Sequence, residues 1–577
     1  MTQKPCAFFF VLAIGSLLGP SNALFAGSPR DELLRLTPPE VTFCLCVQDL
    51  RDHVQEWKNS PFWENFPSTR LGKVVLDSAE YKRLQDLKEQ LSKVLGEPIT
   101  RVRDDMFGDA IVIAYQAGPP GKPEEERGLL LTWLRDPKLA EQCFARLNET
   151  QKQSGELKEI QSEEYHGLTC IHRAKSQGQD EYYCLHGNIL MFSAQKPMLH
   201  KVVDLWASQL SVERATPFLA KEFDRLGLDK SIAALWLNPR SFDTELSQKL
   251  KAAKDNEASF LAAFQQVWQV VDGIGLSLSI EKNFECKLVI SAQRDKLPQK
   301  MRGFPAVTTA SSLWQSFPPD ALLAIAGHTD FAVILEALGQ FVSPEHRKSI
   351  HDSMEQNLGG VIGKDLLPLL PKHLGPEWGV CLTAPTSGSV TPEFLFALQV
   401  RPSPEPNQVE QAVEDALDTV STLLRFTYNA SHAEPLRQKV LQDGKVRIKY
   451  LVQEQAFPPG FQPAFALKDG FLMIASTPAA IQHFQTKAAT EPSSSVEIPL
   501  LRISLRQWDA YLQQSQAAVA KFLAAKNQAP EAEVHQQIDK LRMLLELLDH
   551  FEIVNQSQKP GQLVLAARLK FRAAWKK

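Results

Sequence analysis

Thr37-Pro38-Pro39-Glu40-Val41 opens an apolar stretch at residues 43–47, and the same arrangement returns near the middle of the chain. There, Phe317-Pro318-Pro319-Asp320-Ala321 opens a second apolar stretch at residues 322–326. Each stretch runs into an amphipathic segment of helical period. A short apolar stretch followed by such a segment predicts a strand and then a helix. The chain therefore carries one structural pattern twice.

Further matches extend this repetition along both halves. Leu95-Gly96 returns as Leu358-Gly359, residues 107–112 return loosely as 374–380, and residues 186–194 match 469–476. These pairs are offset by roughly 263 to 283 positions. They predict two tandem homologous domains.

The composition is that of an ordinary globular protein of more than one domain. The chain has 577 residues, of which 44% are hydrophobic and 23% are charged. This length exceeds what one hydrophobic core usually serves. Lys plus Arg number 63 and Asp plus Glu number 67, and this near-neutral balance gives no electrostatic case for nucleic acid. We expect no nucleic-acid partner.

The N-terminus has the pattern of a secretory signal peptide. Lys4 precedes an uncharged apolar run at residues 7–18, and small residues at 21–23 suit a cleavage site. An apolar run of about 12 residues is too short to span a bilayer as a helix. We predict a signal peptide at residues 1–23, a periplasmic or extracellular location, and no integral membrane span after cleavage. Retention of this segment as an uncleaved anchor is the alternative.

The remaining chain divides at a stretch rich in proline and charge. We predict a first domain at residues 29–294, a linker at 295–312 and a second domain at 313–572. Strands joined by tight turns, with helices between groups of strands, favour an α+β fold. Each domain is expected to have a mainly antiparallel sheet with helices packed on it.

Individual helices have clear signals. Residues 77–95 carry an apolar stripe at Leu84, Leu87, Leu91 and Val94, and Gly96 ends the segment. Asp136-Pro137 is a typical helix start. Late in the chain, residues 507–527 and 531–548 flank Ala529-Pro530 and predict a helical hairpin, with a shorter equivalent between Arg240 and Val271. Mixed strands and helices therefore run through both halves.

Familiar catalytic motifs are absent from the sequence. There is no Gly-x-Ser-x-Gly, no phosphate-binding Gly-rich loop and no His-Glu-x-x-His. Gly273-Ile274-Gly275 lacks a third glycine and reads as a strand with a close backbone approach. His346 and His351 are five apart and are expected to be solvated. We assign no catalytic, cofactor-binding or metal-binding residue and expect no cofactor.

Two Cys-x-His units form the most specific cluster. Cys170 and His172 lie on one predicted strand, Cys184 and His186 on the next, and a loop at 175–180 can reverse the chain. A hairpin centred on Gln177 places Cys170 opposite Cys184. Separate half-buried cysteines, a disulfide and a Cys2His2 zinc site all remain open, in that order of preference. The hairpin register places the two histidines on opposite sides of the cysteine pair, which opposes a zinc site.

Other cysteines and aromatic residues have simpler interpretations. Cys44 and Cys46 lie two apart on a strand and are best read as small buried apolar residues, because the second half has alanines there. Removal of Cys6 with the signal leaves seven cysteines, an odd number that argues against a full disulfide framework. The aromatic group at residues 57–66 either seals the end of a core, the preferred interpretation, or marks a partner surface.

The opening of the mature chain resembles a group of large exported bacterial proteins of unknown function, many from planctomycetes. The resemblance rests on the signal peptide, residues 36–41, the apolar strand, residues 47–50 and Asn59-Ser60-Pro61. It implies no activity, cofactor or catalytic residue.

The function expected from these observations is that of an exported, non-catalytic binding or structural protein of the cell envelope. Its partner is expected to be another protein or an apolar ligand. An exported hydrolase of unfamiliar type and a carrier of an apolar ligand are the alternatives.

Overall fold

The computed structural model describes residues 28–208, 216–281, 283–297, 299, 309–362, 373–385, 390–402, 408–486 and 497–572. These residues form two compact units. The first contains residues 28–245 and 271–292, and the second contains residues 246–270 and 293–572. The predicted signal peptide lies outside the described residues, as do 298 and 300–308 of the predicted linker. The domain limits derived from the sequence stay predictions.

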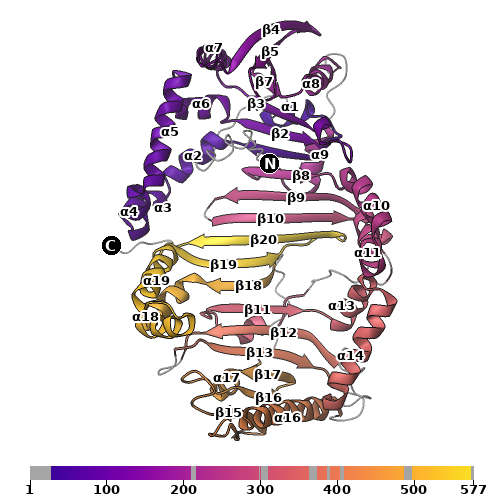
Figure 1. The fold of residues 1–577 in the computed structure, drawn as a ribbon, viewed down its shortest axis with the longest axis vertical. Helices are drawn as coiled ribbons and strands as arrows, with labels where there is room; N and C mark the ends of the chain where they lie inside the picture. The colour runs from indigo at the N-terminus through magenta and orange to yellow at the C-terminus, as the bar shows by residue number, and fades with distance from the viewer. Residues whose placement is uncertain are drawn as a thin grey trace. The chain divides into compact units, whose positions relative to one another are not determined.

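Ten described strands of the first unit form an antiparallel sheet (Figure 1). Their order across the sheet is β4–β5–β6–β7–β3–β2–β1–β8–β9–β10. The strands are β1 (Phe43–Gln48), β2 (Ala110–Gln116), β3 (Arg127–Trp133), β4 (Leu157–Tyr165), β5 (Leu168–Lys175), β6 (Glu181–His186), β7 (Ile189–Ser193), β8 (Ala233–Leu237), β9 (Val271–Ile280) and β10 (Asn283–Ala292).

Two helix boundaries of the first unit lie where the sequence predicts, namely the start of α7 and the end of α5, whereas α5 begins at Ala79 and not at residue 77. Asp136 caps α7 by accepting a hydrogen bond from the Leu139 backbone N–H, and Gly96 ends α5 in the left-handed conformation with φ of 71°. The helices are α1 (Pro29–Arg35), α2 (Leu50–Lys58), α3 (Pro61–Asn65), α4 (Arg70–Asp77), α5 (Ala79–Leu95), α6 (Ile99–Met106), α7 (Pro137–Gln153), α8 (Lys196–Ser208) and α9 (Phe218–Arg225).

The second unit also contains ten described antiparallel strands, in the order β14–β15–β16–β17–β13–β12–β11–β18–β19–β20. They are β11 (Leu323–His328), β12 (Leu374–Thr383), β13 (Glu393–Val400), β14 (Arg437–Asp443), β15 (Val446–Val452), β16 (Ala464–Lys468), β17 (Phe471–Ala475), β18 (Ile498–Ser504), β19 (Leu548–Asn555) and β20 (Gln562–Phe571).

The helices of the second unit include the predicted hairpin, in which α18 contacts α19. Its shorter equivalent is formed by α10 and α11, where the Gln265 amide donates a hydrogen bond to the Ser247 hydroxyl. Most of α10 and all of α11 group with the second unit, although they precede β9 in the chain. The helices are α10 (Asp243–Ala252), α11 (Asp255–Val270), α12 (Leu313–Ser316), α13 (Phe331–Leu338), α14 (Pro344–Ile362), α16 (Gln408–Asn429), α17 (Pro478–His483), α18 (Leu505–Asn527) and α19 (Glu531–Leu545).

The predicted α+β class with mainly antiparallel strands is confirmed. The strand order of the second unit repeats that of the first, strand for strand, when β11 is matched to β1 and the others follow. Helices recur as well, because α5 contacts α7 in the first unit and α14 contacts α16 in the second. The two units therefore share their strand order and strand pairing, while their homology stays a prediction from the sequence.

Equivalent methionines mark the same position in each sheet. Met191 on β7 pairs with Cys184 on one side and Leu131 on the other, and all three are buried. Met473 on β17 pairs with Ala466 and Ala397 in the same manner, and these are buried too. Directly paired residues of an antiparallel sheet project from one face. Each methionine is therefore the centre of a buried row that crosses its sheet.

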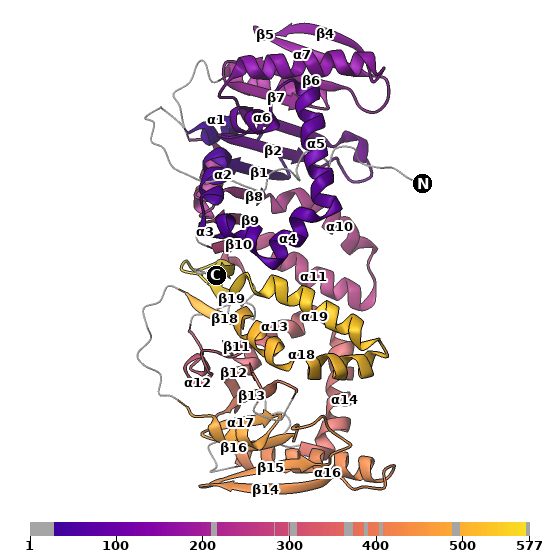
Figure 2. The same ribbon diagram turned by 90° about the vertical axis from the view of Figure 1, so that its left-hand side faces the viewer.

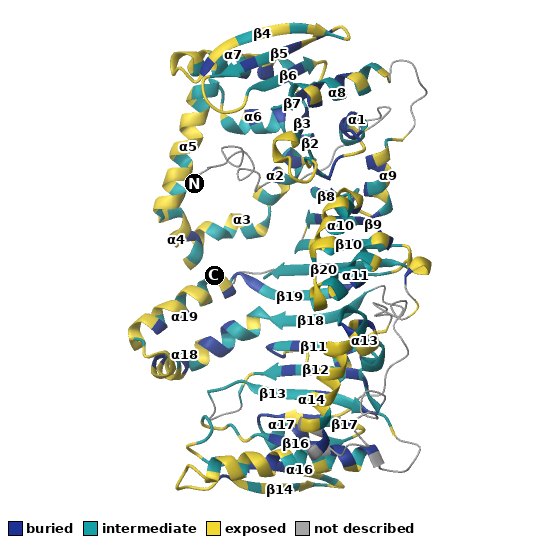
Figure 3. Ribbon diagram, turned by 45° about the vertical axis from the view of Figure 1, so that its right-hand side comes forward, coloured by how far each residue is buried: buried dark blue, intermediate teal, exposed yellow. Residues whose placement is uncertain are grey.

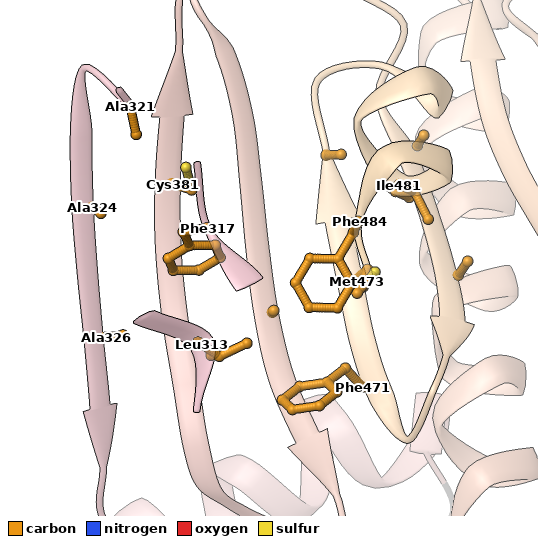
Figure 4. Close-up of a cluster of buried hydrophobic side chains, with 14 of the residues drawn as sticks. Leu313, Phe317, Ala321, Ala324, Ala326, Cys381, Phe471, Met473, Ile481 and Phe484 are labelled. Atoms are coloured by element: carbon orange, nitrogen blue, oxygen red, sulfur yellow. The ribbon is translucent and has the colours of Figure 1, made fainter. Parts of the chain in front are cut away.

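Figure 4 shows the core around Met473. Leu313 of α12 and Phe317 after it pack with side chains from the strands and with Ile481 and Phe484 at and after α17. Alanines at 324 and 326 leave room for the larger rings. The core members are Leu313, Phe317, Ala321, Ala324, Ala326, Cys381, Ala397, Ile448, Ala464, Ala466, Phe471, Met473, Ala475, Ile481 and Phe484.

Gly273 and Gly275 lie within β9, as expected from a strand with a close backbone approach. A Cβ atom at Gly273 would lie 2.5 Å from a guanidinium nitrogen of Arg225, and one at Gly275 would lie 2.7 Å from Leu228 Cδ1. Because glycine has no Cβ atom, these two positions leave room for Arg225 at the end of α9 and for Leu228 after it.

The matched methionines give a direct test of the two cores. We expect Met191→Ala and Met473→Ala each to lower the free energy of unfolding of its own unit by about 2–5 kcal/mol, because each removes a fully buried side chain. Urea unfolding, monitored by hydrogen exchange of backbone amides in each unit, measures the loss of stability and shows which unit has lost it. Met354→Ala on α14 is the control, since Met354 is 44% exposed and its loss should change stability by less than about 0.5 kcal/mol. Unchanged stability in both core variants would contradict the assignment.

Candidate functional site

The predicted apolar stripe of α5 is accessible to solvent. Leu84, Leu87 and Leu91 are 56%, 44% and 39% exposed, and Val94 is half-buried. We call these four residues the α5 seam. Their spacing of three, four and three residues is that of the a and d positions of a coiled coil. α5 is anchored near its C-terminal end, where Leu95 packs against the cluster formed by α6 and α7.

The accessible apolar area continues onto the preceding helix. Val74 and Val75 of α4 are 56% and 37% exposed, and α4 contacts α5. Figure 3 shows much of α4 and α5 in the colour of exposed residues, and Figure 2 shows these helices from the side. An amphipathic helix normally turns its apolar face to a core. The exposure of this face therefore marks it as a candidate binding surface.

The aromatic group at residues 57–66 lies beside this surface. The rings of Trp63 and Phe66 stack with centroids 5.6 Å apart, and the Trp57 ring meets Phe284 of β10 at 5.2 Å. None of the four aromatic residues from this stretch is buried, and Trp63 is 41% exposed. The aromatic group therefore links α2 and α3 to the first residues of β10, and its Trp63 ring remains accessible to solvent.

One face of the first sheet is also incompletely covered. Ile113, Leu45, Leu235 and Leu276 are paired across β2, β1, β8 and β9, so their side chains project from the same face. Leu276 is 42% exposed and the other three are half-buried. This face is the second accessible apolar feature of the unit.

The two Cys-x-His units lie on β5 and β6, as predicted, and Cys170 pairs directly with Cys184. Both cysteines are buried free thiols. A hydrogen bond with Cys184 lowers the pKa of Cys170, and the same bond together with burial raises the pKa of Cys184. The two sulfur atoms are therefore close neighbours within the sheet.

The two histidines are not directed toward these thiols. His172 Nε2 lies 2.9 Å from Asp180 Oδ2, and its ring stacks on Tyr182 at 4.6 Å. The His186 ring contacts Trp206 at 4.7 Å. Among the described residues, no group of three or more His, Cys, Asp or Glu is arranged to hold a metal ion.

Cys44 and Cys46 are buried on β1, in agreement with their interpretation as apolar residues. Burial raises the pKa of Cys46 to about 12, so its thiol stays protonated near neutral pH. His346 and His351 are exposed on α14, as expected.

A buried carboxylate in the second unit was missed by the sequence analysis. Glu377 of β12 is 8% exposed and pairs with His328 of β11. His328 Nδ1 lies 2.7 Å from Glu377 Oε1. Glu377 Oε2 accepts hydrogen bonds from the Ser311 hydroxyl, from the Ser312 hydroxyl, and from the Ser312 backbone N–H at 2.8 Å. A carboxylate that holds an imidazole in this way leaves Nε2 to act as an acceptor or base.

The first unit provides an internal comparison for this group. Gln48 and Ala110 are the paired residues at the equivalent positions of β1 and β2. The Gln48 amide donates instead to the Asp229 carbonyl at 2.6 Å. At this position of the sheet, the carboxylate–imidazole pair is therefore present in the second unit and absent from the first. Its sequence signal was weak, because the partners are 49 residues apart and follow no known motif.

Comparison with known proteins yields one family match. Residues 107–366 match a family model described as a protein of unknown function (DUF3352). The match begins just before β2, ends after α14 and covers less than half of the chain. No curated protein and no solved structure matches the chain. Among the described helices, none combines the length and apolar character needed to cross a membrane.

The Glu377 group makes a stability prediction. We expect His328→Ala to lower the free energy of unfolding of the second unit by about 1–3 kcal/mol, because a buried carboxylate loses a hydrogen-bond donor. Urea unfolding measures the change. His346→Ala, on exposed α14, is the matched control and should cost less than about 0.5 kcal/mol. Equal stability of both variants would show that His328 contributes no net stabilisation.

Proposed function

We propose that this protein is an exported, non-catalytic binding protein of the cell envelope, and that α5 of its first unit binds an amphipathic helix of a partner protein. The observation that carries the proposal is the exposed α5 seam. Isolated exposed leucines are common on protein surfaces, but three at coiled-coil spacing on one helix form a continuous stripe.

Charges beside the seam favour an acidic partner. With Leu84 and Leu91 at a positions, Arg83 falls at a g position and Lys88 at an e position, and both are exposed. Residues at e and g select the partner of a coiled coil through interhelical ion pairs. A helix with leucine at a and d and glutamate at e and g therefore matches α5 in both shape and charge.

The seam alone supports a weak complex. Full burial of one leucine contributes about 1.5–3 kcal/mol, and the seam leucines are already partly covered. Three leucines and a valine together fall short of the roughly 8 kcal/mol that a micromolar complex requires once ordering costs are included. The neighbouring Trp63 and Val74 supply additional apolar area for a tighter complex.

Two further features of the chain support the proposed role: the N-terminal export pattern and the repeated strand order. The N-terminal pattern at residues 1–23 supports secretion, and the resemblance to large exported bacterial proteins, many from planctomycetes, agrees with it. The repeated strand order supports descent of the two units from one ancestral domain. Differences between them, such as the pair His328 and Glu377, would then have arisen after duplication.

A carrier of an apolar ligand is the second candidate. The partly exposed row that includes Leu45 and Leu276 favours it, because an aliphatic chain would cover those side chains. For the alternative of a hydrolase, the supporting observation is the contact between His328 and Glu377. There the Ser311 and Ser312 hydroxyls bond to the carboxylate, which differs from a serine activated by an imidazole base.

Helix binding is testable with designed peptides. We expect a helical peptide with leucine at a and d and glutamate at e and g to bind the purified protein, with fluorescence anisotropy as the readout. The triple variant Leu84→Gln, Leu87→Gln, Leu91→Gln should weaken binding at least about tenfold, because each substitution removes an apolar contact. The matched control is Leu423→Gln, Leu424→Gln on α16, where both leucines are also exposed.

Charge reversal sharpens this test. The variant Arg83→Glu, Lys88→Glu should prefer a peptide with lysine at e and g over the glutamate peptide. Equal binding of both peptides by the parent protein, or loss of binding in the α16 control, would reject α5 as the site. Preferential binding of a fatty acid with no peptide binding would favour the apolar-ligand carrier.

Export makes a separate prediction. When the full chain is expressed in a bacterial host with an envelope, the mature protein should begin after Ala23, because small residues at 21–23 suit signal peptidase. Intact mass and N-terminal sequencing of the fractionated protein measure this. An uncleaved chain in the membrane fraction would indicate a retained anchor, and an uncleaved chain in the cytoplasm would reject export.

A further inference from the structure

The backbone places Cys170 and Cys184 as a disulfide requires. The two residues are directly paired on the antiparallel strands β5 and β6, and their side chains project from one face. Directly paired residues have Cα atoms roughly 4.5–5.5 Å apart, within the range that disulfides span. The register therefore gives a Cα separation compatible with a disulfide.

We propose that Cys170 and Cys184 form a disulfide in the exported protein, by exchange with a small-molecule or protein disulfide. This inference rests on the proposed export, since an oxidising compartment supplies the disulfide co-reactant. The Cys170 thiolate attacks one sulfur of the co-reactant and expels a thiolate. The Cys184 thiolate then attacks the Cys170 sulfur and expels the second thiolate. The protein loses two electrons and two protons, and the co-reactant becomes two thiols.

Cys170 is the residue suited to the first attack. It lies on the strand next to the edge strand β4, where it pairs with Glu163. The hydrogen bond with Cys184 lowers the pKa of Cys170 and outweighs burial and the carboxylates of Glu163 and Glu164, which raise it, and Lys196 contributes a smaller lowering. Thiolate character governs the rate of attack on a disulfide. Because both cysteines are buried, the exchange takes place either during folding, before other residues cover the β5–β6 hairpin, or when the folded hairpin opens locally.

The other cysteines of the first unit do not offer such a pair. Cys44 and Cys46 share one strand and project to the same face two residues apart, and Cys44 pairs with Ala114. Cys143 lies on α7, and the exposed Cys286 pairs with Leu278. Cys286 is therefore a matched control, because it is the accessible thiol of the same sheet without a paired cysteine.

The second unit shows that the fold does not require this pair. The residue paired with Met473, in the position that Cys184 takes beside Met191, is Ala466. A disulfide would therefore be a feature of the first unit. It would close a loop of about 13 residues and hold the β5–β6 hairpin in register.

Peptide mapping tests the proposal. The purified protein is incubated folded in oxidised glutathione, quenched with an alkylating agent in denaturant, and digested without reductant. We expect a linked peptide that contains Cys170 and Cys184, with five of the seven described cysteines alkylated. Cys170→Ser and Cys184→Ser should abolish the linked peptide, and Cys286→Ser should retain it. Reduction should lower the urea midpoint of the parent protein and of Cys286→Ser, but leave Cys170→Ser unchanged.

The outcomes separate the disulfide from the export proposal. Seven alkylated thiols after incubation, or a link through Cys286, would overturn the inference. If serine variants fail to fold, mapping of the parent protein alone still decides whether the link exists. A link that forms in purified protein while the protein in cells stays uncleaved and reduced would reject export and retain the thiol chemistry. A link present in protein taken directly from the envelope would support both.

Discussion

Antiparallel pairing in a single register is the constraint on which the rest of this structure depends. Because side chains alternate along a strand, a shift of one residue would turn every buried side chain of that strand to the opposite face. The row through Met191 shows the consequence, since Cys184, Met191 and Leu131 are buried together only in this register. The pairing of Cys170 with Cys184 and the row through Met473 follow from the same rule.

The helices packed near the sheet bury their apolar faces to different degrees. Met198 and Val202 of α8 are fully buried, and α8 contacts three strands of the first sheet. In contrast, α5 packs on the helices α6 and α7 and keeps Leu84 exposed. An amphipathic pattern therefore predicts that a helix forms, while its neighbours decide whether the apolar face becomes core or binding surface. This distinction is the basis of the binding role proposed for α5.

The two units share a strand order and differ in their polar chemistry. A sulfur pair occupies the methionine row of the first unit, and alanine takes the equivalent place beside Met473. A buried carboxylate and an imidazole pair in the second unit, where the first has Gln48 and Ala110. The hydrogen-bond ladder uses backbone atoms alone, so side chains at equivalent positions can diverge while the sheet is retained. Candidate sites are therefore specific to one unit, although the architecture is common to both.

The sequence by itself determined the local elements, because they depend on residues close together in the chain. The predicted strands at 43–47 and 322–326 agree within two residues at each end with β1 and β11, Gly96 and Asp136 marked the end of α5 and the start of α7, and a loop centred on Gln177 paired Cys170 with Cys184. Only the tertiary structure decided the order of ten strands in each unit, the exposure of Leu84 and the contact between His328 and Glu377. These features depend on segments far apart in the chain, and single-sequence patterns do not encode which distant surfaces meet. The physical reason is that burial of any apolar face is favourable, so the pattern of a helix or strand leaves its partner unspecified.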